Sequence, residues 1–259
     1  MAPLVRELKL QPSFNVILCS SGQHKDMLNQ ALSDFDLAAD IELNAMRGNR
    51  SLSNLVATML ADFQSVIERV NPDVILVHGD TATTLAGSLA AYFNQIPLAH
   101  VEAGLRTYDK HSPWPEEINR RVADLTADLY FAPTSSARQN LLDEGARSSD
   151  IIVTGNTVID ALLLTAKRLQ NSPDLQMHAD SILPRLDPAK KLVLVTSHRR
   201  ENLGAGLENI CDAVRNISNR DDVEIVFPVH MNPKVRTTVD AKLSALPNVF
   251  LTEPLNYLS

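Results

Sequence analysis

Short runs of valine, isoleucine and leucine alternate along the chain with longer stretches in which apolar residues recur at helical spacing. This alternation is typical of βαβ units, because a parallel strand that helices cover on both faces is apolar throughout. The apolar runs predict strands over 14–19, 73–77, 97–101, 128–132, 150–154, 191–196, 223–229 and 248–252. The stretches of helical period predict helices over 24–35, 51–70, 81–94, 115–127, 134–144, 156–169, 206–218 and 233–244. The sequence therefore predicts an α/β protein in which helices flank parallel sheets.

One stretch, 171–190, interrupts this alternation. It is polar, contains three prolines and precedes a new predicted strand. Such a segment is typical of a linker between domains. We therefore predict a first domain over 1–170, a linker region over 171–190 and a second domain over 191–259.

The two ends of the sequence fit this division poorly. Met1, Leu4, Val5 and Leu8 fall at helical spacing with no capping residue before them, which predicts that the chain begins inside a helix. At the other end the chain stops shortly after a predicted strand, and the second domain is small for an independent core. We expect the chain to be truncated at both ends and the second domain to be incomplete. A naturally small second domain is the alternative.

Composition narrows the class of protein. With 44% hydrophobic and 21% charged residues, the chain is predicted to be globular. It has no apolar run near the roughly 20 residues that span a bilayer and no basic-then-apolar start typical of a secretory signal, so we expect a cytoplasmic protein without a membrane segment. A net charge of -7 disfavours wholesale binding of nucleic acid. An anionic ligand must therefore meet a local cationic pocket.

Polar residues that directly follow apolar runs are the first candidates for chemistry, since ligands of open parallel sheets bind at the carboxyl ends of the strands. Asp80 follows the predicted strand 73–77, and a helix cap formed by Asp80 or Thr81 is the alternative interpretation. Glu102 follows the predicted strand 97–101. A carboxylate there is costly unless it is paired or functional, and Arg106 is the candidate for a structural partner.

Two further segments contain groups of charged residues. Glu116 and Glu117 follow a proline, which is also a favourable start for a helix. His198, Arg199 and Arg200 follow the predicted strand 191–196. Arginines bind phosphate through paired donors, and the histidine adds a further polar contact or a proton. A solvated basic loop is the alternative for this second segment.

The sequence offers no signal for a common cofactor. It contains no Gly-x-Gly-x-x-Gly segment, no Walker loop and no set of histidines and cysteines with zinc spacing. These absences disfavour nicotinamide, ATP and zinc. Apart from His198 and His230, the histidines are predicted to be surface or core residues rather than ligands. These are His24, His78, His100, His111 and His178. Taken alone, the residues indicate acidic groups on one domain and a basic anion site on the other.

Six segments in a fixed order carry a family resemblance: His78-Gly79-Asp80-Thr81, His100-Val101-Glu102-Ala103-Gly104-Leu105-Arg106, Ser112-Pro113-Trp114-Pro115-Glu116-Glu117, Thr154-Gly155-Asn156-Thr157, His198-Arg199-Arg200-Glu201 and Pro228-Val229-His230-Met231-Asn232-Pro233. Together they resemble the non-hydrolysing UDP-N-acetylglucosamine 2-epimerases. The resemblance implies two Rossmann-like domains of the GT-B type with the nucleotide sugar between them. It also implies a homodimer, no metal, no nicotinamide, and activation by the substrate at a second site.

The resemblance also implies roles for individual residues. The family interconverts UDP-N-acetylglucosamine and UDP-N-acetylmannosamine by expelling UDP to give a 2-acetamidoglucal and adding it back. By position, Asp80, Glu102 and Glu116 correspond to its catalytic acids, without a division into base and acid, and His198 to its diphosphate-side histidine. Leu255 corresponds to a backbone contact with the nucleobase. The regulatory substrate site corresponds to Gln23, His24, Arg199 and Arg200.

The sequence departs from the family pattern in two places. The N-terminal Gly-Thr-Arg-Pro-Glu loop and a later Asp-Ser-Gly-Gly segment do not occur in it. We therefore expect the 259-residue chain by itself to have little activity. Three alternatives stay open at this point: a hydrolysing 2-epimerase, a GT-B glycosyltransferase and a non-catalytic fragment.

Overall fold

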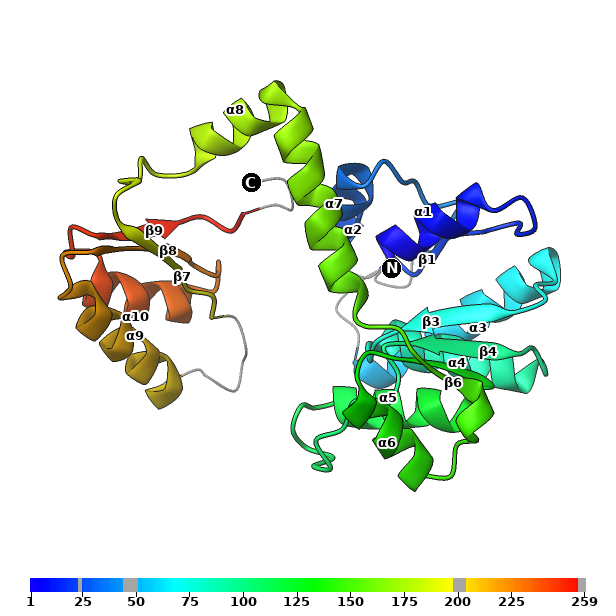
Figure 1. The fold of residues 1–259 in the computed structure, drawn as a ribbon. Coiled ribbons are helices and arrows are strands. Elements are labelled where there is room, and N and C mark those ends of the chain that lie inside the picture. Colours follow the sequence, from blue (N-terminus) through cyan, green and yellow to red (C-terminus); the bar gives the residue numbers. More distant parts are fainter. Residues whose placement is uncertain (23–24, 44–50, 198–203, 256–259) are drawn as a thin grey trace. The chain divides into compact units, whose positions relative to one another are not determined.

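The computed structural model describes residues 1–22, 25–43, 51–197 and 204–255. The chain divides into two compact units, Met1–Leu164 and Thr165–Ser259, which are shown in Figure 1. The range 171–190 contains helix α8 (Pro173–Ile182), which the sequence pattern did not predict. The hydroxyl oxygen of Ser172 accepts a hydrogen bond from the Leu175 backbone N–H and so caps this helix. The assignment of 171–190 as a linker stays a prediction.

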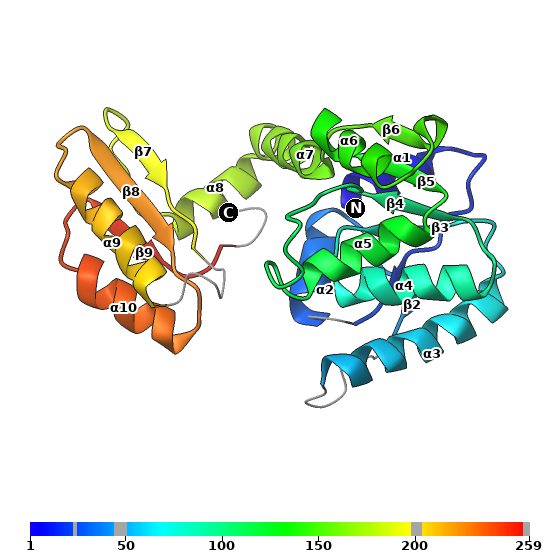
Figure 2. The same ribbon diagram turned by 90° about the horizontal axis from the view of Figure 1, so that it is seen from below.

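The first unit is built on a four-stranded parallel sheet with the order β3-β4-β5-β6. Its strands are β3 (Ile75–His78), β4 (Leu98–Val101), β5 (Leu129–Ala132) and β6 (Ile151–Val153). Figure 2 shows three helices side by side along one face of this sheet, which are α3 (Leu52–Val70), α4 (Ala82–Phe93) and α5 (Glu116–Thr126). The remaining elements are α1 (Ala2–Leu10), β1 (Cys19–Ser20), α2 (Lys25–Asp34), β2 (Ile41–Glu42), α6 (Ser135–Asp143) and the short 3-10 helix η1 (Ser148–Asp150). Helix α7 (Thr157–Asn171) begins in this unit and ends in the second.

Small residues allow α4 to lie close to the sheet. Ala86 and Ala91 are fully buried, and a Cβ atom at Gly87 would lie 3.1 Å from the Cγ1 atom of Val77. The hydroxyl of Thr81 caps the start of the helix by accepting a hydrogen bond from the Thr84 backbone N–H. The alternative interpretation of this segment as a helix cap therefore holds for Thr81, which leaves the side chain of the preceding residue available.

The predicted strand over 14–19 is wrong in extent. Within the described part of this range the strand is limited to β1 (Cys19–Ser20), which pairs with β2 in a separate two-stranded parallel sheet. Before β1 the backbone N–H of Leu18 donates to the carboxylate of Asp40 at 2.7 Å, so a side chain takes the place of a ladder partner. The side chain of Phe14 is 55% exposed. An apolar run without a neighbouring strand does not become part of a sheet.

The second unit contains a three-stranded parallel sheet with the order β7-β8-β9. Its elements besides α8 are β7 (Lys191–Leu194), α9 (Ala205–Ser218), β8 (Val223–Pro228), α10 (Pro233–Leu243) and β9 (Val249–Thr252). Helices α9 and α10 lie side by side on one face of this sheet (Figure 1), where Leu207, Cys211, Phe227 and Val239 form the core. The two units confirm the predicted α/β class of helices on parallel sheets. No helix in the described ranges is both long and apolar enough to cross a membrane.

Candidate active site

The turns that follow β3 and β4 lie next to each other at the carboxyl edge of the first sheet. The two strands are adjacent and parallel, with His78 paired to Val101 in register. Gly79 follows β3 with a φ of 67°, a conformation that favours glycine, and its N–H donates to the carbonyl of Val101 at 3.0 Å. These turns carry Asp80 and Glu102, the two carboxylates that the strand-end rule singled out.

Asp80 is held against the first turns of α5. Its backbone carbonyl accepts a hydrogen bond from the Asn119 side chain at 2.9 Å, and its carboxylate lies 3.4 Å from the Nη2 atom of Arg120. Burial raises the pKa of the Asp80 carboxyl above its ordinary value, against the opposing effect of Arg120. The negative charges of Glu116 and Glu102 raise it further. The charges of the other two predicted acids therefore act on Asp80 at this edge of the sheet.

Glu102 has a strained backbone and a well-contacted carboxylate. Its φ of 68° is unusual for a residue other than glycine, and its N–H donates to the carbonyl of Phe131 on β5 at 3.0 Å. One carboxylate oxygen accepts a hydrogen bond from Asn156 at 2.9 Å, and the other lies 3.2 Å from the Nε2 atom of His78. The proximity of His78, followed by the bond from Asn156, lowers the pKa of Glu102 despite its partial burial.

The two adjacent glutamates of the third segment have different surroundings. Glu116 opens α5 and is half-buried. Glu117 is fully buried, and its carboxylate accepts hydrogen bonds from the backbone N–H groups of Thr107 and Tyr108, both at 3.1 Å. Glu117 therefore anchors the loop that follows Glu102, while the charge of Glu116 acts on the carboxyl group of Asp80. The sequence pattern alone did not separate these two functions.

Asp124, on helix α5, links the turns that follow β3 and β4. Its carboxylate lies 2.6 Å from the Nδ1 atom of the fully buried His100, and it accepts a hydrogen bond from the Gly104 N–H at 3.1 Å. The other ring nitrogen of His100 lies 2.8 Å from the carbonyl oxygen of Gly79. A carboxylate and a carbonyl can only accept, so both ring nitrogens are placed to donate. Through these contacts one buried carboxylate supports the turns of both Asp80 and Glu102.

The expected pairing of Arg106 with Glu102 is wrong. The guanidinium instead makes two hydrogen bonds to the carboxylate of Glu144, at 2.9 and 2.7 Å, and lies 2.8 Å from Asp124. Although burial opposes its charge, the hydrogen bond to Glu144 and the charge of Asp124 raise the pKa of Arg106. Because Arg106 forms a bidentate pair with Glu144, the carboxylate of Glu102 contacts Asn156 and His78 instead.

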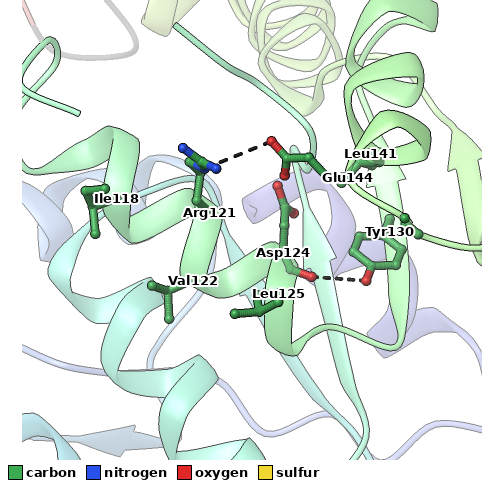
Figure 3. A pocket seen from close by; sticks show the side chains of 10 residues that line it. Ile118, Arg121, Val122, Asp124, Leu125, Tyr130, Leu141 and Glu144 are labelled. Atoms are coloured by element: carbon green, nitrogen blue, oxygen red, sulfur yellow. Dashed lines mark hydrogen bonds and ion pairs between the residues drawn. The ribbon is translucent and has the colours of Figure 1, made fainter. Parts of the chain in front are cut away.

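A hollow of 480 Å³ lies between α5 and α6 (Figure 3), and Asp80, Glu102 and Glu116 are not among the residues that line it. In this view Arg121 points toward Glu144, and the phenol of Tyr130 donates to the backbone carbonyl of Asp124. The hollow has a mainly apolar lining, which consists of Ile118, Arg121, Val122, Asp124, Leu125, Tyr130, Leu141, Glu144, Gly145 and Ala146. The charged residues that line this hollow include Asp124 and Glu144, whose carboxylates contact Arg106 and support the turns after β3 and β4. We therefore place the candidate site at Asp80 and Glu102.

The remaining predicted site residues fall in two groups. Leu255 is half-buried and follows β9 in the second unit. The other group lies outside the described residues and consists of Gln23, His24, His198, Arg199 and Arg200. In the described ranges no three histidine, cysteine, aspartate or glutamate side chains come together as a metal-ligand set.

Sequence reasoning missed two residues of this site, His78 and Asn156. Both lie in segments that follow or end a strand, and both touch Glu102. The prediction for His78 was a surface or core residue, because a single histidine beside an apolar run carries no partner information. The available signal was position, since His78 ends β3 and Asn156 follows β6 at the same edge of the sheet.

Comparison with known proteins gives a consistent result. The family model described as UDP-N-acetylglucosamine 2-epimerase matches residues 6–259. The chain is 48% identical over 259 residues to a probable UDP-N-acetylglucosamine 2-epimerase of Ralstonia nicotianae and 46% identical to the UDP-N-acetylglucosamine 2-epimerase of Escherichia coli. In both cases the match covers all of this chain and 69% of the relative.

The fold is also similar to solved structures. The crystal structure of UDP-GlcNAc 2-epimerase from Neisseria meningitidis, bound to UDP-GlcNAc, matches with a TM-score of 0.93 and 42% identity. The match covers 100% of this chain and 70% of that one. This likeness over the whole chain confirms the predicted α/β fold class with two Rossmann-like domains of the GT-B type.

Proposed function

Because the chain belongs to the UDP-N-acetylglucosamine 2-epimerase family, we propose that it interconverts UDP-N-acetylglucosamine and UDP-N-acetylmannosamine without releasing free sugar. The observation that supports this most directly is the pair of carboxylates, Asp80 and Glu102, at the ends of adjacent parallel strands. Their surroundings move their pKa values in opposite directions. Two carboxyl groups of different proton affinity are what an acid and a base require.

The proposed reaction is an elimination followed by a re-addition. A carboxylate takes the proton from C2, the C1–O bond breaks, and its electron pair leaves with UDP while a double bond forms between C1 and C2. The 2-acetamidoglucal then accepts UDP at C1, and a carboxylic acid returns a proton to C2 on the opposite face. Cationic groups near the diphosphate stabilise the charge that develops on the leaving group.

We assign Asp80, Glu102 and Glu116 to the proton transfers and His198 to the diphosphate side. Asp80, Glu102, His198 and Leu255 are the proposed substrate contacts. A regulatory substrate site formed by Gln23, His24, Arg199 and Arg200 and a homodimer are further proposals that rest on the family resemblance. A cytoplasmic location is a further proposal that rests on the sequence pattern. No cofactor enters the proposed reaction, because UDP itself is the group that leaves and returns.

Isosteric amides test these assignments in the protein as its gene encodes it. Asp80→Asn, Glu102→Gln and Glu116→Gln are each expected to lower turnover by about a hundredfold or more while UDP binding stays near the wild-type value, since a positioned acid or base acts on C2 and not on the nucleotide. Asp221→Asn, at an exposed position before β8, is the matched control. A variant that keeps the wild-type rate of solvent-deuterium incorporation at C2 excludes that residue from proton transfer.

NMR of the products separates the proposed function from its alternatives. The epimerase retains the nucleotide sugar and gives UDP-N-acetylmannosamine. Release of UDP with free N-acetylmannosamine would indicate a hydrolysing enzyme, and transfer of the sugar to an added acceptor would indicate a glycosyltransferase. A protein that is stabilised by UDP in a thermal-shift titration but leaves the substrate unchanged would be a binding module.

A further inference from the structure

The carboxylate of Glu102 is contacted on both of its oxygens by side chains from two other segments. Asn156, which follows β6, donates from its Nδ2 atom to Oε1 at 2.9 Å. His78, the last residue of β3, places its Nε2 atom 3.2 Å from Oε2. The side chain of Glu102 lies between these two groups on a backbone with a φ of 68°, and such strain persists only where the surroundings hold it in place.

The orientation of the Asn156 amide follows from its second contact. Its Oδ1 atom accepts a hydrogen bond from the Val158 N–H at 3.0 Å in the first turn of α7. A backbone N–H can only donate, so the amide oxygen must face Val158 and the amide nitrogen must face Glu102. The start of α7 therefore fixes which group Asn156 presents to the carboxylate.

The contact from His78 has a different character. Its Nε2 atom is buried and makes no aligned hydrogen bond with the described residues, although Glu102 lies within ion-pair distance. A buried polar nitrogen without a hydrogen bond is costly, so its position calls for a reason. The close approach to the Glu102 carboxylate is the interaction that the described side chains provide.

We propose that His78 and Asn156 are positioning residues that hold Glu102 as the proton acceptor of the resting enzyme, with its carboxylate in a fixed orientation toward C2. This inference rests on the proposed function and adds to it a division of labour between the two acids. Within the described ranges the carboxylate of Asp80 has one polar side-chain contact, with Arg120 at 3.4 Å, instead of a contact on each oxygen. Glu102 is therefore the group that takes a proton in the first step, and Asp80 is the group that supplies one in the second.

Asn156 allows the positioning role to be separated from the structural one. Asn156→Asp keeps the oxygen that caps α7 but replaces the donor to Glu102 with a second carboxylate, whereas Asn156→Ala removes both contacts. We expect turnover to fall about tenfold or more in both variants, while the helix cap is lost only in Asn156→Ala. If Asn156 served only as a helix cap, Asn156→Asp would have wild-type turnover, and this result would overturn the proposal for Asn156.

His78 is tested by removal and by partial replacement. His78→Ala is expected to lower kcat about tenfold with little change in KM, and to move the acidic limb of the kcat/KM profile to higher pH, because Glu102 then binds its proton more tightly. His78→Gln keeps an N–H donor near the same position and is expected to restore part of the loss. His178→Gln, an exposed histidine on α8, is the matched control.

The outcomes distinguish this inference from the proposed function. Glu102→Gln with wild-type turnover would remove Glu102 from the reaction and so contradict the proposed function itself. A severe loss in Glu102→Gln, combined with wild-type rates and pH profiles in His78→Ala and Asn156→Asp, would leave the proposed function in place and overturn the positioning role. A shifted acidic limb in both positioning variants supports it.

Discussion

The turns after β3 and β4 have equivalent places in the fold, at the carboxyl ends of adjacent strands, but the carboxylates that they carry have different surroundings. Among the described residues, Asp80 is desolvated beside a single cation, Arg120 at 3.4 Å, whereas Glu102 is contacted on both oxygens. The first environment favours the protonated acid and the second favours the carboxylate. Adjacent strand ends can thus give two chemically similar groups opposite proton affinities, and the difference comes from the residues around them.

A second difference concerns how each turn is packed. A Cβ atom at Gly79 would lie 3.6 Å from the Glu102 carboxylate, which is an ordinary contact. A Cβ atom at Gly104 would collide with the backbone carbonyl of Ala137 on α6. The turn after β4 is therefore locked against a helix, while the turn after β3 has room. The buried pair of His100 and Asp124 supports both.

The largest effect on this comparison is expected from removing the support that the two turns share. Asp124→Asn takes away the charge that His100 and Arg106 contact, and breaking a buried ion pair typically costs about 3 to 5 kcal/mol. We expect the free energy of unfolding, measured by urea denaturation, to fall by that amount. Asp143→Asn, at an exposed position on the neighbouring helix α6, is the control. An Asp124→Asn variant as stable as the control would show that the turns are supported independently.

Alanine substitutions of the turn glycines test the difference in packing. Gly79, Gly104 and Gly145 all have positive φ, so each alanine variant is expected to lose about 1 kcal/mol from backbone strain. Gly104→Ala also has to displace the Ala137 carbonyl, and we expect a total loss of about 3 kcal/mol. Gly145→Ala is the matched control, because no atom of the described residues lies within 4 Å of its added Cβ atom. Equal losses at Gly104 and Gly145 would contradict the close packing.

Much of the fold follows from local pattern. The periodicity predicted most strands and helices, and the strand-end rule singled out Asp80 and Glu102. The strand over 14–19 failed because strand formation needs a partner, and there a side chain bonds the backbone instead. Helix α8 was missed because its polar residues, and the three prolines of the range 171–190, are also typical of a linker.

The partners of the site residues were beyond local pattern. Arg106 pairs with Glu144, 38 positions away, in preference to the nearby Glu102. His100 and Asp124 are 24 positions apart, and Asn156 is 54 positions from Glu102. Such contacts are set by how strands and helices pack, so the pattern of neighbours along the chain does not contain them. Candidate groups were therefore predictable, whereas their environments were not.

The smallest expected effect is on the free energy of unfolding as a function of pH. It tests the comparison of the two turns most specifically, because Asp80 and Glu102 should change the stability with opposite signs. The pKa of Glu102 is lowered on folding, so its ionised form stabilises the protein above the unfolded pKa, and this stability is lost as the pH falls through the folded pKa. The pKa of Asp80 is raised, so its contribution is present below the unfolded pKa and is lost as the pH rises through the folded pKa. In the free protein near pH 7 the ionised Asp80 therefore costs stability while Glu102 adds to it, and the raised pKa of Asp80 enlarges the protonated fraction that supplies a proton to C2.

Isosteric amide variants measure the opposite contributions of the two carboxylates to stability. At pH 7 Asp80→Asn is expected to raise the melting temperature and Glu102→Gln to lower it, although both variants lose activity. Because both carboxylates are partly solvated, each change is expected to stay below about 1 kcal/mol. Once the pH has fallen below the folded-state pKa of each group, both are protonated in the wild-type protein, and the two variants should converge on its stability. Calorimetry across this pH range gives the result, and a shift of the same sign at pH 7 in both variants would show that the two turns do not differ in the way their surroundings indicate.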